Sequence, residues 1–482
     1  MCEHTRRNAG AFFLIYFGKE FPRSEFDYAG AVRSLLEQRP GEHKAFVHTY
    51  GCQQNFADSE KLEGILEQMG YTVTHTAEGA EFVIFNTCAI RENAEQRVFG
   101  NVGILKKAHS ENPDMIIAVC GCMVQQEHIA KKFRQSYPFV DIVFGTHAAP
   151  RLPELVYKYL TKKKRLFDIG EGEGCMAEYL PVHRDGLLKA NLPIMHGCDN
   201  FCTYCVVPLV RGREKSRLPE NIIAEAKEIV AAGYKEITLL GQNVNSYGKG
   251  LENPVSFAEL LRMVNDIPGD FRIKFMTSHP KDCTRELLEA IRDCEKACNY
   301  IHLPVQSGSD EVLRRMNRRY TAEHYMELLD MAREIVPGIT FTSDIIVGFP
   351  GETEEDFEAT MELSRKARWL MTYSFIYSKR EGTRAAVMED QIPPEISSAR
   401  FQRLLDLQTE ISHEMNASYV GKTTTVLFDD ECDAGEGYIS GRSFENLVVR
   451  IPRDQAPEGF AKVYLKKSLG WALDGEIIKT EE

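Results

Sequence analysis

The sequence predicts an α/β protein made of an open parallel α/β domain, a partial (βα)6 barrel and a small C-terminal β-barrel. Short apolar runs alternate with helix-like segments from about residue 45 to 165 and again from about 188 to 415, a pattern typical of parallel sheets. From residue 416 onward, short strand-like runs follow one another between Gly, Asp and Pro turns, as in small β-barrels.

The bulk composition limits the possible classes of protein. At 482 residues the chain is long enough for about three domains of ~150 residues each. No apolar run approaches the ~18 residues that span a bilayer, so we expect no membrane association. The formal net charge of −13 argues against nucleic-acid binding through an overall positive field but allows a local basic patch. The odd count of 13 cysteines favours a reducing, cytoplasmic location with metal or cluster chemistry.

Changes in pattern along the chain divide it into five segments. We expect an N-terminal extension at 1–43, an α/β domain at 44–165, a linker at 166–187, a partial barrel at 188–415 and a β-rich domain at 416–479.

In the first α/β domain, three cysteines follow the ends of three expected strands, which lie at 45–50, 82–85 and 115–119. They are Cys52, Cys88 and Cys122. Because loops beyond the carboxyl ends of parallel strands share one edge of the sheet, these thiols can converge into a three-cysteine cluster site. Two alternatives remain open from the residues alone. Each cysteine could be a small buried residue at a turn, and Cys120 could replace Cys122.

The second α/β region contains six strand-like runs, two fewer than a complete eight-fold barrel has. They lie at 189–195, 236–240, 272–276, 300–304, 340–347 and 371–376, with helices expected at 219–232, 286–293, 322–335 and 354–368, and a further helix at 396–415. An incomplete barrel leaves a side opening that could admit a large substrate such as a folded RNA or a protein. In barrels of this kind the chemistry lies in the loops after the strands.

The loop after the first of these strands carries three cysteines in a C-x3-C-x2-C spacing. Cys198, Cys202 and Cys205 can bind three irons of a cubane cluster and leave the fourth iron open to a substrate or cofactor. The alternatives are a zinc site that lacks its fourth ligand, or incidental buried thiols. Zinc frameworks usually pair two C-x2-C clips, and no second clip follows.

Polar residues follow the other strands at the same rim, where a cofactor would need them. They are Gln242, Asn243 and Asn245, Ser278 and His279, Gln306 and Ser307, and Gly348 with Gly351. His279 and His302 are candidate bases, although ordinary hydrogen-bonded histidines are more common. Two basic clusters are candidate phosphate contacts or solvated surface, namely Arg211, Arg213, Lys215 and Arg217, and Arg314, Arg315, Arg318 and Arg319.

The C-x3-C-x2-C motif resembles that of the radical S-adenosylmethionine (SAM) superfamily, and further motifs resemble the MiaB family of tRNA methylthiotransferases. These are TYGCQQN at 49–55, NTCAIRENAEQRVFG at 86–100, GCM at 121–123, GCDNFCTYCVVPLVRGREKSR at 197–217, LLGQNVNSYG at 239–248, LPVQSGSDEVLRRMNRRYT at 303–321 and SDIIVGFPGETEEDF at 343–357. The resemblance covers about residues 44–478. Gln54 stands where a methionine is common in the family.

This resemblance implies an N-terminal methylthiotransferase domain, a radical SAM partial barrel, a C-terminal RNA-binding TRAM domain and two 4Fe-4S clusters. Carried over by motif, the radical SAM cluster is held by Cys198, Cys202 and Cys205, and the auxiliary cluster by Cys52, Cys88 and Cys122, which selects Cys122 over Cys120. The residues expected to contact SAM are Phe201, Tyr204, Gln242, Asn243, Ser278 and Gln306.

The resemblance also implies a reaction and its partners. SAM serves as radical source and as methyl donor, and a methylthio group is added to C2 of N6-isopentenyladenosine next to the anticodon. The expected partners are the tRNA anticodon stem-loop, an electron donor such as flavodoxin or ferredoxin, and a sulfur donor or cluster-repair protein.

Alternative functions remain within and outside this family. The target could be another tRNA adenosine of the threonylcarbamoyladenosine type, or a ribosomal protein, although RGREKSR and the loop at 242–245 resemble the isopentenyladenosine enzymes more closely. A non-catalytic iron–sulfur electron carrier is the alternative of another class. A carrier needs neither the C-x3-C-x2-C spacing nor a partial barrel.

Overall fold

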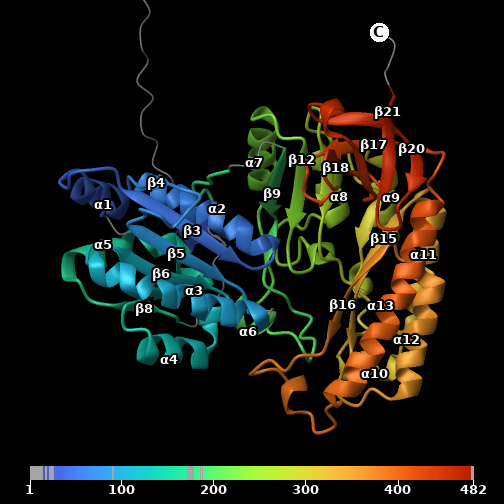
Figure 1. Ribbon diagram of the computed structural model, residues 1–482, viewed down its shortest axis with the longest axis horizontal. Coiled ribbons are helices and arrows are strands. Elements are labelled where there is room, and N and C mark those ends of the chain that lie inside the picture. The colour runs from blue at the N-terminus through green and yellow to red at the C-terminus, as the bar shows by residue number, and fades with distance from the viewer. Residues whose placement is uncertain are drawn as a thin grey trace, which may run out of the picture. The chain divides into compact units, whose positions relative to one another are not determined.

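The structure is a computed structural model that describes residues 15–16, 19–20, 26–89, 92–170, 178–184, 186 and 188–478. The chain divides into two compact units, Met1–Arg184 and Asp185–Glu482 (Figure 1). Residues 171–177 of the expected linker, and most of the first 25 residues, lie outside the described part. Among the described helices, none has both the length and the apolar character that a membrane span requires.

The first unit contains a six-stranded, fully parallel sheet with the order β4-β3-β5-β6-β7-β8. Its strands are β3 (Lys44–Tyr50), β4 (Thr72–Val73), β5 (Phe82–Thr87), β6 (Ile116–Gly121), β7 (Ile142–Phe144) and β8 (Leu166–Asp168). Its helices are α1 (Tyr28–Glu37), α2 (Gln53–Gln68), α3 (Glu92–Glu111), α4 (Glu127–Ser136) and α5 (Leu152–Lys162), with short 3-10 helices η1 (Met123–Gln125) and η2 (Thr146–Arg151). A two-stranded hairpin pairs β1 (Ile15–Tyr16) with β2 (Lys19–Glu20).

Every residue of β5 and β6 is buried, because helices cover both faces of this sheet. Alternate residues of β5 enter separate apolar cores: Phe82 packs with α1, α2 and α5, and Val83 packs with α3 and α4. The sequence did not predict α1, whose buried residues in the first core are Val32 and Leu36. It also did not predict β4, β7 or β8, each of two or three residues. Short elements of this kind carry too little periodicity to be recognised.

The second unit contains the expected six-stranded partial barrel, divided into two parallel three-stranded sheets. These sheets have the orders β13-β12-β9 and β14-β15-β16, and an isolated parallel bridge joins Ile273, in β13, to Ala297, which precedes β14. The strands are β9 (Lys189–Pro193), β12 (Glu236–Leu240), β13 (Arg272–Phe275), β14 (Tyr300–His302), β15 (Thr340–Val347) and β16 (Met371–Ile376). A hairpin of β10 (Met195–His196) and β11 (Lys215–Ser216) follows β9.

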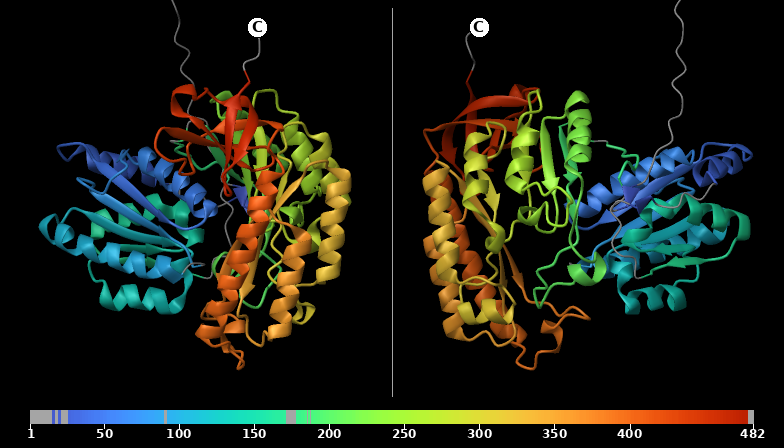
Figure 2. Two further views of the ribbon diagram at one scale, coloured as in Figure 1. Left: turned by 45° about the vertical axis from the view of Figure 1, so that its right-hand side comes forward. Right: turned by 180° about the vertical axis from the view of Figure 1, so that it is seen from behind.

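Helices of the second unit lie outside these strands, and successive long helices contact one another (Figure 2). They are α6 (Val207–Val210), α7 (Pro219–Ala231), α8 (Phe257–Asn265), α9 (Arg285–Asp293), α10 (Asp310–Arg315), α11 (Ala322–Ile335), α12 (Glu354–Ala367) and α13 (Pro394–Ala417), with 3-10 helices η3 (Val244–Ser246), η4 (Pro280–Asp282) and η5 (Ala385–Val387). Together with the first unit, this arrangement confirms the predicted α/β class.

The C-terminal residues form a closed five-stranded barrel with the order β17-β18-β19-β21-β20, as predicted. Its elements are β17 (Thr423–Phe428), β18 (Tyr438–Ser443), β19 (Val448–Pro452), η6 (Arg453–Gln455), β20 (Phe460–Ser468) and β21 (Leu473–Ile477). In the sequence, the last strand-like run lies at 471–472, whereas β21 begins directly after it, at Leu473.

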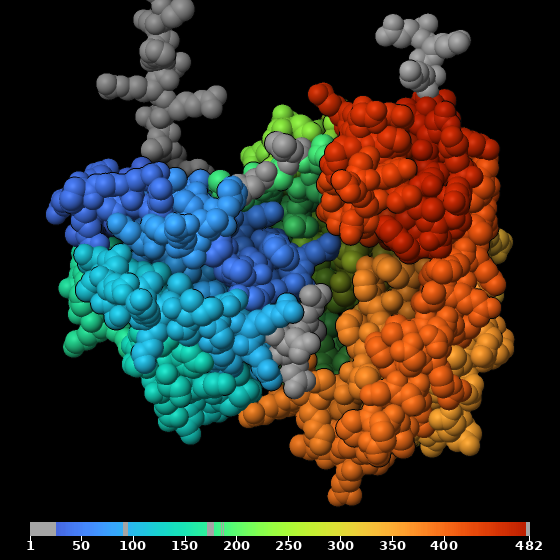
Figure 3. Space-filling model, in the orientation of Figure 1, coloured from blue at the N-terminus to red at the C-terminus, as the bar shows by residue number. Residues whose placement is uncertain are grey.

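The C-terminal barrel packs on the amino-terminal ends of the partial-barrel strands and contacts α13 through β20. In Figure 3 its residues, in red, adjoin the orange residues of the same unit. Arg272 and Glu236 begin neighbouring strands in register and form a buried ion pair of 2.6 Å. Arg272 also donates to the carbonyl of Arg442 at 2.6 Å, and Lys274 donates to Asn446 Oδ1 at 2.9 Å. Burial would raise the pKa of Glu236, but Arg272, Lys274 and Lys189 lower it to about 2. The base of the partial barrel is thus closed by paired charges.

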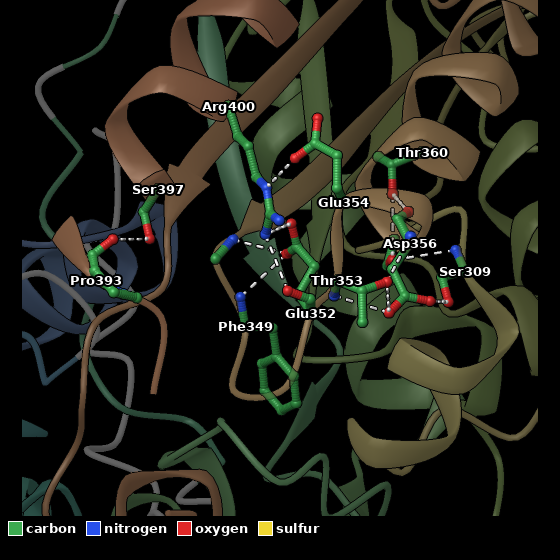
Figure 4. A network of polar contacts seen from close by, with 12 residues as sticks. Ser309, Phe349, Glu352, Thr353, Glu354, Asp356, Thr360, Pro393, Ser397 and Arg400 are labelled. Carbon is green, nitrogen blue, oxygen red and sulfur yellow. Dashed lines mark hydrogen bonds and ion pairs between the residues drawn. The ribbon is translucent and has the colours of Figure 1, made fainter. Parts of the chain in front are cut away.

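A second buried ion pair fixes the turn after β15 (Figure 4). Glu352 accepts hydrogen bonds from the backbone N–H groups of Gly348, at 2.7 Å, and Phe349, at 3.1 Å. Arg400, from α13, donates to the Glu352 carboxylate at 3.2 Å and to its carbonyl at 3.0 Å. Arg400 also pairs with Glu354 at 3.0 Å. Helix α13 therefore holds a turn at the end of the partial barrel opposite to the C-terminal barrel.

We expect Arg400→Ala to destabilise the second unit by about 3 to 5 kcal/mol, because it leaves the Glu352 carboxylate buried without its cation. The matched control is Arg403→Ala, which removes an arginine whose side chain is 45% exposed and pairs with Glu354. Arg403→Ala should lower the free energy of unfolding by at most about 1 kcal/mol. Urea unfolding followed by tryptophan fluorescence measures this difference in the second unit, because the only two tryptophans, Trp369 and Trp471, lie there.

The destabilisation should also depend on pH. Burial raises the pKa of Glu352 to about 7 from 4.5, against the opposing effects of the Phe349 N–H, Arg400 and the Gly348 N–H. The folded protein therefore binds the additional proton, and the free energy of unfolding falls as pH rises from about 4.5 to about 7. Loss of Arg400 raises this pKa further, so the cost of Arg400→Ala should be larger at pH 8 than at pH 5. An equal cost at both pH values would contradict this account.

Candidate active site

The loop with Cys198, Cys202 and Cys205 projects from the β10–β11 hairpin at the carboxyl end of β9. Gly197 has a φ of +76°, and a Cβ atom there would lie 2.1 Å from the carbonyl oxygen of Arg213. Only glycine fits this close approach. The N–H of Cys198 then donates to the carbonyl of Gly212 at 3.3 Å, and the N–H of Cys205 to that of Cys202 at 3.0 Å. The loop is therefore a tight, internally bonded turn.

The turn between α10 and α11 supports this cysteine loop. Thr203 donates its N–H to the carbonyl of Met316 at 3.0 Å and its hydroxyl to that of Arg315 at 2.9 Å. Asn317 has a φ of +59° and donates its side-chain amide to the carbonyls of Asn200, at 3.2 Å, and Phe201, at 3.0 Å. The sequence alone does not reveal these roles, because they depend on the approach of two distant segments.

Arg318, in the same turn, is buried and contacts Cys202, which is a candidate ligand of the cluster. Its Nη1 donates to Cys202 Sγ at 3.5 Å, its Nη2 to the carbonyl of Pro304 at 2.7 Å and its Nε to the hydroxyl of Tyr320 at 2.7 Å. Arg318 is therefore not available as a phosphate contact on the surface. From the sequence alone, this residue is a candidate for either a phosphate contact or a solvated surface position.

The other arginines of this cluster differ in their surroundings. Arg314 pairs with Glu311 and Arg315 with Asp390, each at 2.6 Å, whereas Arg319 is exposed. Of the other basic cluster, Arg211 and Arg217 are buried, and Arg217 pairs with Glu225 at 2.9 Å.

The three thiols of the loop are close enough to affect one another electrostatically. Burial first, and then the neighbouring Cys202, raise the pKa of Cys205 to about 12. Burial also raises the pKa of Cys198, where Cys202 adds to the effect. Among the described residues, no three His, Cys, Asp or Glu side chains converge to hold one metal ion. A cubane cluster does not require three side chains to converge on one ion, because each thiolate binds a different iron.

The expected SAM-contacting residues lie at the same rim but are engaged to different degrees. Gln242 Oε1 accepts a hydrogen bond from the N–H of Gly197 at 2.6 Å, and Asn243 donates to Asp282 at 2.8 Å. Among the described residues, Asn243 Oδ1 and Ser278 Oγ are buried without a hydrogen-bond partner, although most buried polar groups have one. Gln306, with a φ of +74°, is also buried.

The two aromatic candidates lie within the cysteine loop itself. Phe201 is exposed and has Arg213 over its ring at 5.3 Å. Tyr204 packs edge to face on Phe349, with ring centroids 6.5 Å apart. The Glu352–Arg400 pair holds Phe349 and therefore also supports the cysteine loop.

Two histidines near the rim are engaged in hydrogen bonds. His279 Nδ1 accepts from the N–H of Lys281 at 3.2 Å, and His302 contacts the hydroxyl of Thr342 at 2.9 Å. Burial, followed by Arg318, Lys281 and Lys249, lowers the pKa of His279 far below its usual value. His279 is therefore neutral. Of the cations near it, Lys249 and Lys281 pair with Asp282, at 3.2 and 3.6 Å.

In the first unit, Cys52, Cys88 and Cys122 follow β3, β5 and β6, which are adjacent strands. The last paired residues, Tyr50, Thr87 and Gly121, lie side by side in register. Neighbouring strands lie about 4.8 Å apart, so the three strand ends span about 10 Å. The sheet order on which the sequence prediction depended therefore brings these loops together.

Gly121 permits the turn that leads to Cys122. Its φ is +95°, and a Cβ atom would lie 2.3 Å from the carbonyl oxygen of Thr87. The N–H of Cys122 donates to that same carbonyl at 2.9 Å. Cys120, by contrast, lies within β6 and packs in an apolar core.

A buried amide network, not recognised from the sequence, supports the Cys52 loop. Asn55 accepts a hydrogen bond from Cys52 Sγ at 3.4 Å and donates to Asn86 at 3.3 Å and to the carbonyl of Thr87 at 3.2 Å. Asn86 donates in return to the carbonyl of Asn55 at 2.8 Å and to Ser59 at 2.9 Å. The only signal in the sequence was the position of these amides beside the cysteines.

Two family models match the chain. The radical SAM superfamily matches residues 192–364, and Uncharacterized protein family UPF0004 matches residues 44–145. The first range contains the cysteine loop at 198–205, and the second contains Cys52, Cys88 and Cys122.

Similar proteins carry the name tRNA-2-methylthio-N(6)-dimethylallyladenosine synthase. The protein from Thermoanaerobacter pseudethanolicus is 48% identical over 93% of this chain and 96% of its own length. That from Clostridioides difficile is 51% identical over 86% of this chain and 87% of its own length. That from Acetivibrio thermocellus is 46% identical over 96% and 98%, respectively.

This chain belongs to the tRNA-2-methylthio-N(6)-dimethylallyladenosine synthase family. It is therefore a radical SAM methylthiotransferase, as the sequence motifs indicated. Membership of the radical SAM superfamily implies a 4Fe-4S cluster and SAM.

Solved structures that resemble this member of the synthase family support the fold. The radical SAM methyltransferase TsrM from Kitasatospora setae, with tryptophan and a SAM analogue, has a TM-score of 0.53 and 14% identity, covering 72% of this chain and 75% of its own. The same enzyme with cobalamin and a [4Fe-4S] cluster has a TM-score of 0.52 and 15% identity, covering 72% and 77%.

We expect substitutions of Asn317 to loosen the cysteine loop. Asn317→Gly removes the amide donor but keeps the left-handed backbone accessible, whereas Asn317→Ala also adds about 1 kcal/mol of backbone strain. Amide hydrogen exchange at residues 198–205 of the cofactor-free chain should rise in both variants, and more in Asn317→Ala. Asn446→Ala is the control, because Asn446 has a φ of +64° but lies at the base of the partial barrel. Unchanged exchange in both Asn317 variants would contradict this role.

Proposed function

We propose that this chain transfers a methylthio group to C2 of N6-isopentenyladenosine next to the anticodon of tRNA. The proposal rests on one observation above all: two sets of three cysteines occupy strand-end loops in a member of the synthase family. The relatives' name specifies a dimethylallyladenosine in tRNA, which is the same nucleoside.

In this proposal, Cys198, Cys202 and Cys205 hold the radical SAM cluster. Three thiols on one short loop, a cationic Arg318 against one of them and buried polar atoms without partners nearby suit a metal cluster and a polar cofactor. When bound, the reduced cluster supplies the electron that cleaves SAM to a radical able to abstract an inert C–H hydrogen.

The chain's own residues would bind and orient SAM at this rim. Asn243 and Ser278 would offer it their unpartnered oxygens, and Gln306 and the aromatic residues Phe201 and Tyr204 would line the same site. Gln242 would act indirectly, because its Oε1 is already bonded to Gly197.

Cys52, Cys88 and Cys122 would hold a second 4Fe-4S cluster, which presents the sulfur that SAM methylates. The adjacency of β3, β5 and β6 supports this assignment, and the core position of Cys120 supports Cys122 as the third ligand. Gly121 and the Asn55–Asn86 network would position the ligands.

The proposal includes partners and a location. The C-terminal barrel, at 416–479, would contact the anticodon stem-loop, and the first two functional domains would cover 44–165 and 188–415. A low-potential donor such as flavodoxin or ferredoxin would supply electrons, and a sulfur donor or cluster-repair protein would restore the second cluster. A tRNA substrate and cluster thiolates fit a cytoplasmic location.

The two cysteine sets should be separable by substitution. Replacing Cys52, Cys88 and Cys122 with Ala should remove roughly half of the iron and stop sulfur insertion, but should leave SAM cleavage to deoxyadenosine. Replacing Cys198, Cys202 and Cys205 should abolish SAM cleavage. Iron and sulfide quantitation with anaerobic turnover measures both effects, and Cys120→Ala is the matched control that should keep all of the iron. Full iron in either triple variant would refute that ligand set.

The nucleoside product identifies the substrate. We expect tRNA from a deletion strain to lose 2-methylthio-N6-isopentenyladenosine and to accumulate N6-isopentenyladenosine, as measured by liquid chromatography and mass spectrometry of nucleosides. An undiminished amount of the methylthio nucleoside would overturn the substrate assignment. Loss of a methylthio-threonylcarbamoyl nucleoside instead would support the alternative within the family.

A further inference from the structure

Arg318 is a buried cation whose counter-charge does not come from a carboxylate. The side chain is 7% exposed, and its three guanidinium nitrogens contact a hydroxyl, a carbonyl and the thiol of Cys202. Among the described residues it forms no ion pair with Asp or Glu. Burying an unpaired charge is costly, so proteins rarely keep one without an anion nearby.

The other buried arginine pairs in this unit show what a purely structural cation looks like. Arg272 pairs with Glu236 at 2.6 Å, and Arg400 pairs with Glu352 at 3.2 Å. Each of these arginines has a carboxylate that neutralises it within the fold. Arg318 has instead the sulfur of a candidate cluster ligand.

We propose that Arg318 is a positioning residue that raises the reduction potential of the cluster held by Cys198, Cys202 and Cys205. This inference rests on the proposed ligand assignment. A cluster held by three thiolates carries one more negative charge after reduction, and a fixed cation with an N–H···S hydrogen bond stabilises that charge. Arg318 stays protonated throughout, because guanidinium groups do not lose their proton in proteins.

The surrounding contacts fix the guanidinium in place before any electron arrives. Tyr320, whose hydroxyl accepts from Arg318 Nε, donates to the carbonyl of Val305 at 2.8 Å, and Pro304 accepts from Nη2. The remaining edge of the planar group therefore faces Cys202. Because the Arg318 guanidinium is already fixed, it loses no further orientational freedom when the negative charge on the Cys202 sulfur increases.

The test uses the full-length chain with Cys52, Cys88 and Cys122 replaced by Ala, so that one cluster remains. In this background, Arg318→Gln, Arg318→Lys and Arg319→Gln are compared by electron paramagnetic resonance during anaerobic redox titration with low-potential mediators. One electron enters the cluster from the mediator, and no bond forms or breaks. Iron per chain is measured in each sample, and signals are normalised to it.

We expect Arg318→Gln to lower the ratio of reduced to oxidised cluster about tenfold at a fixed solution potential. For a one-electron couple this corresponds to a decrease of about 59 mV in the reduction potential of the cluster. Arg318→Lys keeps the charge but not the planar fork, so its shift should be smaller. Arg319→Gln removes an equal charge from the adjacent exposed position, where solvent screens it, and should leave the potential unchanged.

Three outcomes would overturn the inference. The first is an unchanged potential in Arg318→Gln with normal iron content. The second is an equal shift in Arg319→Gln. The third is loss of iron from both Arg318 variants, which would make Arg318 a requirement for cluster assembly. Absence of the cluster from the parent chain would instead overturn the proposed ligand set.

Discussion

Parallel pairing of β-strands is the constraint on which both cysteine sites depend. Strands that run in one direction end at one edge, so residues far apart in sequence meet wherever their strands are neighbours. In the first unit, Tyr50, Thr87 and Gly121 end three adjacent strands, and a cysteine follows each within two residues. In the second unit the cysteine loop follows β9, and polar residues follow β12 and β13 beside it. The apolar cores behind these edges hold the strands in register.

Much of this architecture could be predicted because buried parallel strands are continuous apolar runs. Strands β12 and β15 and helix α11 have the bounds expected from the sequence. Short strands such as β7 were missed because three residues show no period. The cysteines were recognisable by their spacing and their positions after strands. The roles of Asn317 and Arg318 were not, since they depend on two segments more than a hundred residues apart meeting in space.

The two ends of the partial barrel handle charge in opposite ways. At the base, Glu236 neutralises Arg272, and Lys274 and Lys189 hold that carboxylate ionised. At the rim, Lys249 and Lys281 pair with Asp282, whereas Arg318 contacts Cys202 Sγ and, among the described residues, no carboxylate. The buried charges at the base are therefore neutralised by other residues of the fold.

The C-terminal barrel docks on that base at a fixed distance from the rim, and the length of β15 sets this distance. Thr340, the first residue of β15, donates its hydroxyl to the carbonyl of Glu445 at 2.5 Å, and Val347, the last, precedes the turn at the rim. Eight extended residues cover about 26 Å. Strand β15 therefore fixes the separation between the base, where the C-terminal barrel docks, and the turn at the rim.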